Sequence, residues 1–267
     1  MIFDVGLHEG EDSEFYLKKG FEVVAVEANP ELCEKARDRL RRHVEAGQIT
    51  IVNAAIAEQT GPVRFFVNEQ ASVWGTTSPE WAARNKRLGT WSSEITVEGI
   101  QFRRLLEAFG IPYYLKVDIE GTDLLCIRAL QGFHQRPKYI SIESNKTSWR
   151  GLVHEFELLK LLGYSKFKVI DQSQVAAQRC PSPAMEGTFV DHHFAFGSSG
   201  LFGEEAPGDW LSEREALKVY RNIFLRYRLF GDAGLLRRLP PMPADLPFIW
   251  RLDRLRNVGW YDTHAAI

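Results

Sequence analysis

The chain has few cysteines and no long hydrophobic run. Its 267 residues include only Cys33, Cys126 and Cys180, which are odd in number and far apart. This spacing encodes neither a disulfide framework nor a zinc site, and it is typical of reduced thiols in the cytoplasm. No apolar stretch reaches the roughly 18 residues of a membrane-spanning helix, and the first residues resemble a core strand instead of a signal peptide. We therefore expect a soluble, cytoplasmic protein without a membrane partner.

An excess of positive charge is also missing. The 33 lysines and arginines are balanced by 35 aspartates and glutamates, and the formal net charge is -2. Because broad binding to nucleic acid needs a basic footprint, we expect no nucleic-acid partner. The sequence also lacks a P-loop lysine and a G-x-S-x-G elbow, so nothing in it supports a kinase or a serine hydrolase.

A glycine-containing turn joins the first two strands that the sequence predicts. An apolar run at residues 2–5 is followed by Gly6 and Gly10, and then by acids typical of the first turn of a helix. Gly20 ends this helix, and the apolar run at residues 21–26 leads to Glu27. In an open parallel sheet, ligands bind beyond the carboxyl ends of the strands, where such an acid can accept both hydroxyls of a ribose.

The spacing of the glycines and the acids around them favour a cationic nucleoside over a dinucleotide. The turn has the pattern G-x-x-x-G instead of G-x-G-x-x-G, Asp4 precedes it, and Glu11 and Asp12 follow it. We expect these carboxylates to repel a pyrophosphate and to attract an ammonium group. S-adenosylmethionine (SAM) combines an adenosine, a sulfonium and an amino acid, so it fits better than NAD. Two alternatives stay open, an NAD-dependent oxidoreductase and a non-catalytic SAM-binding module that docks on a partner.

Three segments carry a resemblance to a known family. DVGLHEGEDSEFYLKKGF, VVAVEANP and YLKVDIEG resemble the FkbM family of SAM-dependent O-methyltransferases, and the resemblance extends over residues 2–200. It implies a Rossmann-like class I methyltransferase fold and methyl transfer to a hydroxyl of a small molecule or glycan. This chain departs from many relatives in having Leu7 and His8 where they have Ala-Asn.

The rest of the chain alternates between predicted strands and helices. This alternation predicts an α/β fold with a mainly parallel, doubly wound sheet. Residues 71–93 hold Trp74, Trp81 and Trp91 among small polar residues, which indicates either a long loop over the acceptor site or an exposed insertion. We predict helices at residues 30–46, 101–109, 121–130 and 152–162, and strands at residues 49–57, 63–67, 95–97, 113–119, 139–143, 167–170 and 189–196.

The composition changes near residue 200. We predict a SAM-binding domain over residues 1–200 and a helical extension over residues 201–267. Ser212 and Glu215 form a capping box for a helix that ends near Phe230, and Asp245 caps a further helix. Because aromatic side chains accompany the arginines of this extension, we expect it to shape the acceptor pocket or a homodimer contact.

The candidate cofactor-binding residues follow the ends of the first four central strands. Asn53 is placed to hydrogen-bond an adenine, although a turn asparagine is an equal alternative. The full set is Asp4, Gly6, His8, Gly10, Asp12, Ser13, Glu27, Ala28, Asn29, Asn53, Ala54 and Asp118.

The candidate catalytic residues are Asp118, Glu143 and His192. Asp118 belongs to the D-x-E-G segment of the resemblance, and it would orient the SAM amino group or the acceptor, or else cap the next helix. His192 is a candidate base at neutral pH, and His8 competes for that role. Acids near Asp118 and Glu143 could hold magnesium, but strand alternation would separate them, so we predict no metal.

Overall fold

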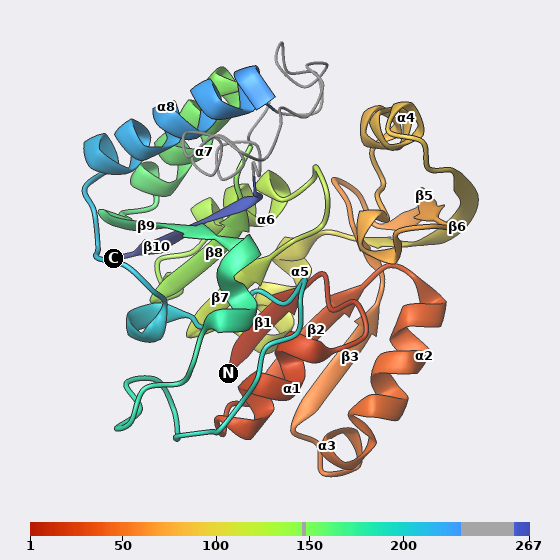
Figure 1. Ribbon diagram of the computed structural model, residues 1–267. Coiled ribbons are helices and arrows are strands. Elements are labelled where there is room, and N and C mark those ends of the chain that lie inside the picture. The colour runs from red at the N-terminus through yellow and green to blue at the C-terminus, as the bar shows by residue number, and fades with distance from the viewer. Residues whose placement is uncertain (146–147, 231–258) are drawn as a thin grey trace, which may run out of the picture.

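The computed structural model describes residues 1–145, 148–230 and 259–267. The described chain forms a seven-stranded sheet with helices on both faces, and a three-stranded sheet projects from one side (Figure 1). The strand order in the large sheet is β3-β2-β1-β7-β8-β10-β9. These strands span Ile2–Val5 (β1), Val23–Glu27 (β2), Ile49–Asn53 (β3), Tyr114–Val117 (β7), Tyr139–Glu143 (β8), Lys166–Asp171 (β9) and Tyr261–Ala266 (β10).

The large sheet is mostly parallel, as predicted. Strands β3, β2, β1, β7 and β8 run parallel to one another, whereas β10 is antiparallel to both β8 and β9. The chain first builds outward from β1 through β2 to β3, and it then returns to the other side of β1 as β7. Because the order reverses between β1 and β7, the crevice at their carboxyl ends is the expected ligand site.

Helices bury apolar side chains on both faces of this sheet. One core packs residues of α1 and α2 against the sheet, and the other packs residues of α5, α6, α7 and α8. Strands covered on both faces read as continuous apolar runs, which is why β1 and β7 were predictable. The helices are Glu11–Lys18 (α1), Pro30–Arg39 (α2), Arg41–Glu45 (α3), Pro79–Arg87 (α4), Phe102–Phe109 (α5), Leu124–Ala129 (α6), Trp149–Leu161 (α7) and Glu213–Phe230 (α8), with short 3-10 helices at Ser72–Trp74 (η1), Leu130–Gly132 (η2), Gln172–Ala177 (η3) and Gly203–Glu205 (η4).

The helix predicted over residues 30–46 is divided into α2 and α3. The division falls at Leu40, whose backbone leaves the helical region at φ -101° and ψ 15°. Leu40 is only 1% exposed, so this turn keeps an apolar anchor in the core while the chain changes direction.

The segment predicted as a loop, residues 71–93, contains a helix. Ser78 Oγ accepts a hydrogen bond from Trp81 N, and Pro79 occupies the first helical position of α4. This helix stands beside the three-stranded sheet, in which β6 (Ser92–Ile100) lies between β4 (Ala55–Ile56) and β5 (Gly61–Asn68) (Figure 1). The many small polar residues concealed the helix in the sequence.

The strand predicted over residues 189–196 is wrong. Phe194 is buried in this segment, but Phe189 and Phe196 are 53% and 77% exposed, and the segment does not join the sheet. The position between β8 and β9 is taken instead by β10, from the end of the chain.

The first helix of the predicted extension is confirmed. Ser212 Oγ accepts from Glu215 N, and the Glu215 carboxylate accepts from Ser212 N, so the capping box precedes α8 as expected. Helix α8 lies beside α7 (Figure 1). The helix predicted to begin at Asp245 lies outside the described residues, and the boundary at residue 200 stays a prediction. In the part of the chain that the structure describes, no helix is both long and apolar enough to span a bilayer.

Candidate active site

The glycine turn after β1 brings two strand ends into contact. Gly6 has φ +95°, and a Cβ atom at this position would lie 1.9 Å from the Asp118 carbonyl oxygen. Gly10 has φ +89° and forms the N-cap of α1. Only glycine can adopt the left-handed backbone at residue 6 and also leave room for the Asp118 carbonyl oxygen. The turn therefore closes directly on the segment that leaves β7.

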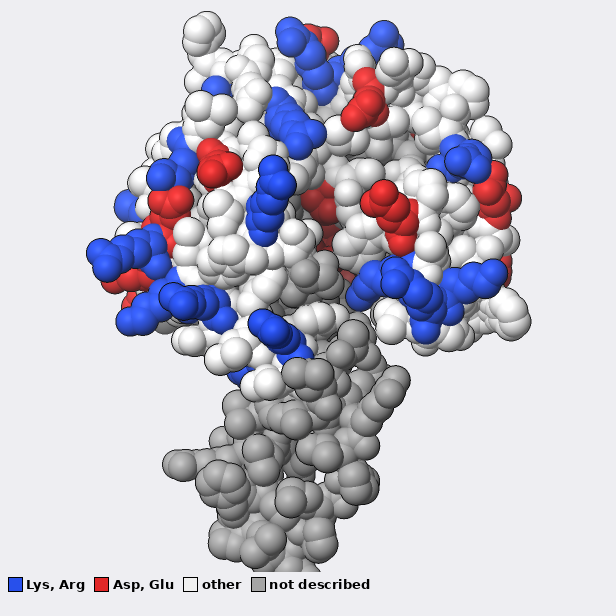
Figure 2. Space-filling view, turned by 90° about the horizontal axis from the view of Figure 1, so that it is seen from above, with Lys and Arg blue, Asp and Glu red and all other residues white. Residues whose placement is uncertain are grey.

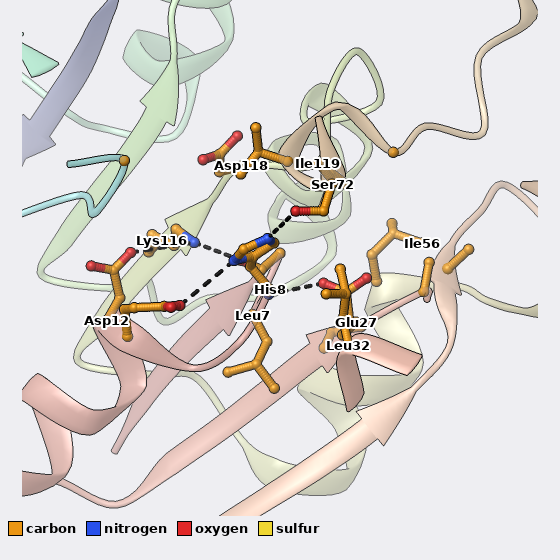
Figure 3. Close-up of a pocket in the computed structure, with 18 of the residues that line it drawn as sticks. Leu7, His8, Asp12, Glu27, Leu32, Ile56, Ser72, Lys116, Asp118 and Ile119 are labelled. Carbon is orange, nitrogen blue, oxygen red and sulfur yellow. Dashed lines mark hydrogen bonds and ion pairs between the residues drawn. The ribbon is translucent and has the colours of Figure 1, made fainter. Parts of the chain in front are cut away.

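Glu27 lies at the carboxyl end of β2 with its carboxylate fixed by backbone groups. One oxygen accepts from His8 N at 2.9 Å, and the other accepts from Asn29 N at 2.8 Å. Glu27 is 8% exposed, and this burial raises the pKa of its carboxyl group. In Figure 3 the Glu27 carboxylate faces the pocket. It retains free lone pairs for ligand hydroxyls, because each oxygen accepts one bond from the protein.

His8 connects the turn to the segment around η1. Its backbone has φ +53°, and its Nε2 lies 2.8 Å from Ser72 Oγ. Its Nδ1 is 3.6 Å from a carboxylate oxygen of Glu11. The imidazole lines the pocket (Figure 3). His8 therefore lies in the cofactor turn and lines the pocket, as predicted, and it also joins this turn to the segment around η1.

The sequence analysis missed Lys116, which occupies the centre of β7. This lysine is 4% exposed, and its Nζ donates to the Gly6 carbonyl at 2.7 Å. The same atom lies 3.0 Å from Asp4 Oδ1 and 3.7 Å from Asp12 Oδ2. Although burial lowers the pKa of Lys116, the two carboxylates raise it above the usual range and keep the lysine charged. A lysine inside an apolar strand was the available signal, because buried charges need partners.

Asp4 lies beneath the turn instead of at its mouth. It is fully buried, it pairs with Lys116, and it accepts a hydrogen bond from Ser13 Oγ at 2.7 Å. Neither Asp4 nor Ser13 lines the pocket. The expectation that Asp4 meets a ligand ammonium is therefore corrected, since its charge is already balanced by Lys116.

Asp12, in contrast, lines the pocket. Its carboxylate accepts from Ser199 N at 2.9 Å, and burial raises its pKa to about 6. The pocket, here called the first cavity, lies at the carboxyl ends of β1, β2 and β7. Its lining includes Gly6, Leu7, His8, Glu11, Asp12, Glu27, Ala28, Leu32, Ala54, Ile56, Phe65, Ser72, Val73, Lys116, Asp118, Ile119, Phe196 and Ser198.

Two of the predicted cofactor residues hydrogen-bond to backbone groups of the protein. Asn29 caps α2, because its Oδ1 accepts from Glu31 N at 3.0 Å. The Asn53 amide donates to the Glu27 carbonyl at 2.9 Å, and neither asparagine lines the first cavity. Asn53 thus fits the alternative of a turn asparagine, whereas Ala28 and Ala54 do line the cavity.

A second cavity adjoins the first. The two cavities share Val73, Asp118, Phe196, Gly197 and Ser198. Seen from above, the molecule is hollowed in the middle, with acidic side chains inside the hollow and lysines and arginines around it (Figure 2). The remaining lining of the second cavity is Ala71, Trp74, Trp81, Arg84, Glu120, Glu143, Gln172, Ser199, Trp260 and Asp262.

Three carboxylates converge in the second cavity. Asp118, Glu120 and Glu143 each place one oxygen within 4.8 Å of the other two. Burial, and then the neighbouring Glu143, raise the pKa of Glu120 well above its usual range. The expectation that strand alternation separates these acids is wrong, because Glu120 follows β7 in a left-handed turn with φ +51°. The helix cap proposed as an alternative role for Asp118 is also wrong, since Asp123 occupies the N-cap position of α6.

His192 is the predicted catalytic residue that the structure does not bring to the cavities. Its ring lies 5.0 Å from the Phe15 ring and 4.8 Å from the Phe194 ring, measured between centroids. Burial lowers its pKa, and it lines neither cavity. His192 is therefore not a candidate for the base.

Comparison with known proteins gives a family. The model of the methyltransferase FkbM domain matches residues 4–169. Solved structures similar to this chain include an FkbM methyltransferase from Methylobacillus flagellatus KT, at 19% identity, a TM-score of 0.42, and coverage of 63% of this chain and 39% of that chain. They also include a precorrin-6y C5,15-methyltransferase from Geobacter metallireducens GS-15, at 17% identity, a TM-score of 0.38, and coverage of 63% and 64%. A SAM-dependent methyltransferase from Archaeoglobus fulgidus is 11% identical with a TM-score of 0.39 and coverage of 100% and 85%.

No curated protein matches the chain. The chain spans less than two thirds of the length of the first two structures above. The family model, however, covers more than half of the chain, and it agrees with the resemblance found in the sequence. Membership also implies SAM as the cofactor, as the sequence predicted. The chain therefore belongs to the FkbM methyltransferase family.

Proposed function

We propose that this protein transfers a methyl group from SAM to a hydroxyl of a small molecule or glycan. The observation that carries the proposal is the Glu27 carboxylate, held in the first cavity by the N–H groups of His8 and Asn29. A carboxylate fixed in this way beside a glycine turn is a receptor for the two hydroxyls of a ribose.

The residues around Glu27 fit the rest of the cofactor. Leu32, Ile56 and Phe65 supply apolar surface for an adenine ring, and Asp12 can accept from an ammonium group. The cavity contains more carboxylates than cations, which favours a sulfonium over a pyrophosphate and disfavours NAD. When bound, SAM supplies a methyl carbon that the sulfonium has already activated.

Asp118 is the proposed base for the acceptor hydroxyl. It lines both cavities, so its carboxylate faces the region between cofactor and acceptor (Figure 3). Desolvation by the surrounding protein atoms raises the pKa of Asp118, although Lys116 opposes this effect, and a raised pKa makes a carboxylate a stronger base. Val73 and Phe196 also line both cavities, and they place apolar surface where the two cavities meet.

Calorimetric titration tests the cofactor assignment. We expect SAM and S-adenosylhomocysteine (SAH) to bind the wild-type protein with one site, and NAD to give no heat of binding. Glu27→Gln should weaken SAH binding by about ten-fold or more, because hydrogen bonds to a charged group are lost. The matched control is Glu45→Gln on the exposed face of α3, which should bind SAH as the wild type does.

The Asp118→Asn variant separates methyl transfer from cofactor binding. This variant should bind SAH with nearly unchanged affinity. In a screen of hydroxyl acceptors with methyl-labelled SAM, its rate of SAH production should fall by about 100-fold or more. Full turnover by this variant would remove Asp118 from the role of base. Binding of SAM with no transfer to any acceptor would favour the non-catalytic module.

A further inference from the structure

The second cavity presents many hydrogen-bond acceptors to a ligand. Among the described residues, its lining includes the carboxylates of Asp118, Glu120, Glu143 and Asp262. The described cation in this lining, Arg84, is already engaged, with its guanidinium 4.8 Å from the centroid of the Trp81 ring. A ligand that fills this cavity therefore meets many hydrogen-bond acceptors, and hydrogen-bond donors on the ligand are favoured.

Three of these acids lie close enough together to contact one primary ammonium group. An ammonium nitrogen that donates to three oxygens at about 2.8 Å holds those oxygens about 4.6 Å apart. Oxygens of Asp118, Glu120 and Glu143 all lie within 4.8 Å of one another. The Glu120 backbone is held in place, because its carbonyl accepts a hydrogen bond from Thr76 Oγ1 at 2.7 Å.

Gln172 provides independent evidence for a donor-rich ligand. Its side chain lines the cavity and is only 2% exposed, and its Nε2 donates to Asp262 Oδ2 at 2.5 Å. Its Oε1 has no hydrogen-bond partner among the residues that the structure describes, and the same holds for one buried oxygen of Glu120. Buried acceptors without partners are rare and costly, so both oxygens call for donors supplied by a ligand.

The walls of the cavity suit an organic cation. Trp74, Trp81 and Trp260 line it, and its volume is about 390 Å³. Aromatic faces attract ammonium groups and pack against the carbon skeleton that carries them. A bare metal ion would need only a fraction of this volume and would gain nothing from the rings.

We propose that the second cavity binds the methyl acceptor through a protonated primary amine, so that the acceptor is an amino alcohol of the amino-sugar type. The ammonium group lies among one oxygen each of Asp118, Glu120 and Glu143. The other Asp118 oxygen is left for a hydroxyl of the same molecule that faces the first cavity, and a further hydroxyl donates to Gln172. This inference rests on the proposed function, and it narrows the hydroxyl acceptor to one that carries a positive charge.

The test compares two ligands that differ in one group. SAH is first titrated into the full-length protein, and D-glucosamine and D-glucose are then titrated separately into the SAH-loaded protein. We expect glucosamine to bind about ten-fold or more tightly than glucose, because only its ammonium can donate to the three carboxylates. Glu120→Gln should remove this preference without changing SAH affinity, whereas Glu45→Gln should keep it.

The outcomes separate the inference from the proposed function. If SAH does not bind, the methyltransferase proposal fails first. If SAH binds but glucosamine shows no advantage over glucose, or neither sugar binds, the amine site is refuted while the cofactor assignment stands. Magnesium chloride is titrated as a third probe, and its binding to the wild type but not to Glu120→Gln would overturn the inference in favour of a metal site.

Discussion

At the scale of single residues, the first cavity depends on backbone groups more than on side chains. Glu27 is oriented by two N–H groups, and Gly6 allows the turn to reach the Asp118 carbonyl. Lys116 then holds this turn from below through the Gly6 carbonyl. A change at Gly6 therefore disturbs the cofactor site before it disturbs any ligand contact.

The variant Gly6→Ala tests this dependence. It should lower the free energy of unfolding by about 2 kcal/mol or more and abolish SAH binding, because backbone strain and the contact with Asp118 add together. Gly47→Ala is the matched control, since Gly47 also has a positive φ of +69° but has no atom within 4 Å of an added Cβ. Thermal unfolding and calorimetry measure both effects, and equal losses in the two variants would contradict the close approach at Gly6.

The residues that sequence analysis missed depend on contacts between distant segments. Glu27 was predictable because it lies at the carboxyl end of a buried parallel strand. Lys116 was not, because its partners Asp4 and Asp12 lie more than a hundred positions earlier in the chain. Asn53 was assigned to a ligand because its contact with the Glu27 carbonyl depends on the pairing of β2 with β3.

At the scale of elements, α7, β8, α8 and β10 meet at a buried polar group. Glu155 of α7 is 3% exposed, and Ser144 Oγ lies 3.4 Å from its carboxyl group. Ser144 also contacts Tyr220 of α8 and Thr263 of β10, each at 2.5 Å. Burial raises the pKa of Glu155 from 4.5 to about 8, so the folded protein holds a neutral glutamic acid at this junction.

This raised pKa predicts a pH dependence of stability. Between pH 4.5 and about 8 the folded protein keeps a proton that the unfolded chain releases. The free energy of unfolding therefore falls as the pH rises through this range, by an amount on the order of 5 kcal/mol for Glu155 alone. Above pH 8 its contribution becomes constant.

Glu155→Gln should remove this slope, because glutamine stays neutral at every pH. Urea unfolding of the wild type and the variant at pH 5 and pH 9 measures the difference. Glu157→Gln is the control on the same helix, since the Glu157 side chain is 65% exposed. A wild-type slope that is unchanged in Glu155→Gln would show that the carboxyl group is not protonated in the folded state.

Elements whose signals lie within a few residues of the sequence were predicted, whereas those that depend on distant contacts were not. The capping box of α8 lies within four residues and was predicted correctly. Strand β10 contains the buried residues Asp262, Thr263 and His264. Their polar side chains would predict a loop from the local sequence pattern. Asp262 and Thr263 are accommodated through tertiary hydrogen bonds, with Gln172 and Ser144 respectively, that no local pattern contains.

At the scale of the whole molecule, the end of the chain completes the sheet. Strand β10 pairs with β8 along one edge and with β9 along the other. It also brings Asp262 and the nearby Trp260 to the second cavity. The last residues are therefore part of the fold and of the site, even though the sequence suggested a helical appendage.

Deletion of residues 259–267 should accordingly destabilise the whole protein. We expect the melting temperature to fall by more than about 10 °C, or the soluble protein to be lost, because the edges of β8 and β9 become unpaired. Removal of Ile267 alone is the control, since this residue is 54% exposed and follows β10. A truncated protein that melts like the wild type would show that β10 is not required for the sheet.

If the proposed function is correct, the crevice between β1, β2 and β7 holds an adenosyl cofactor through Glu27. A crystal structure of the protein soaked with SAH tests this contact. We expect density for the ribose within hydrogen-bond distance of both Glu27 oxygens, with the sulfur on the side of Asp118. An empty first cavity, or a cofactor bound with Glu27 turned away from its sugar, would show that Glu27 does not bind the ribose.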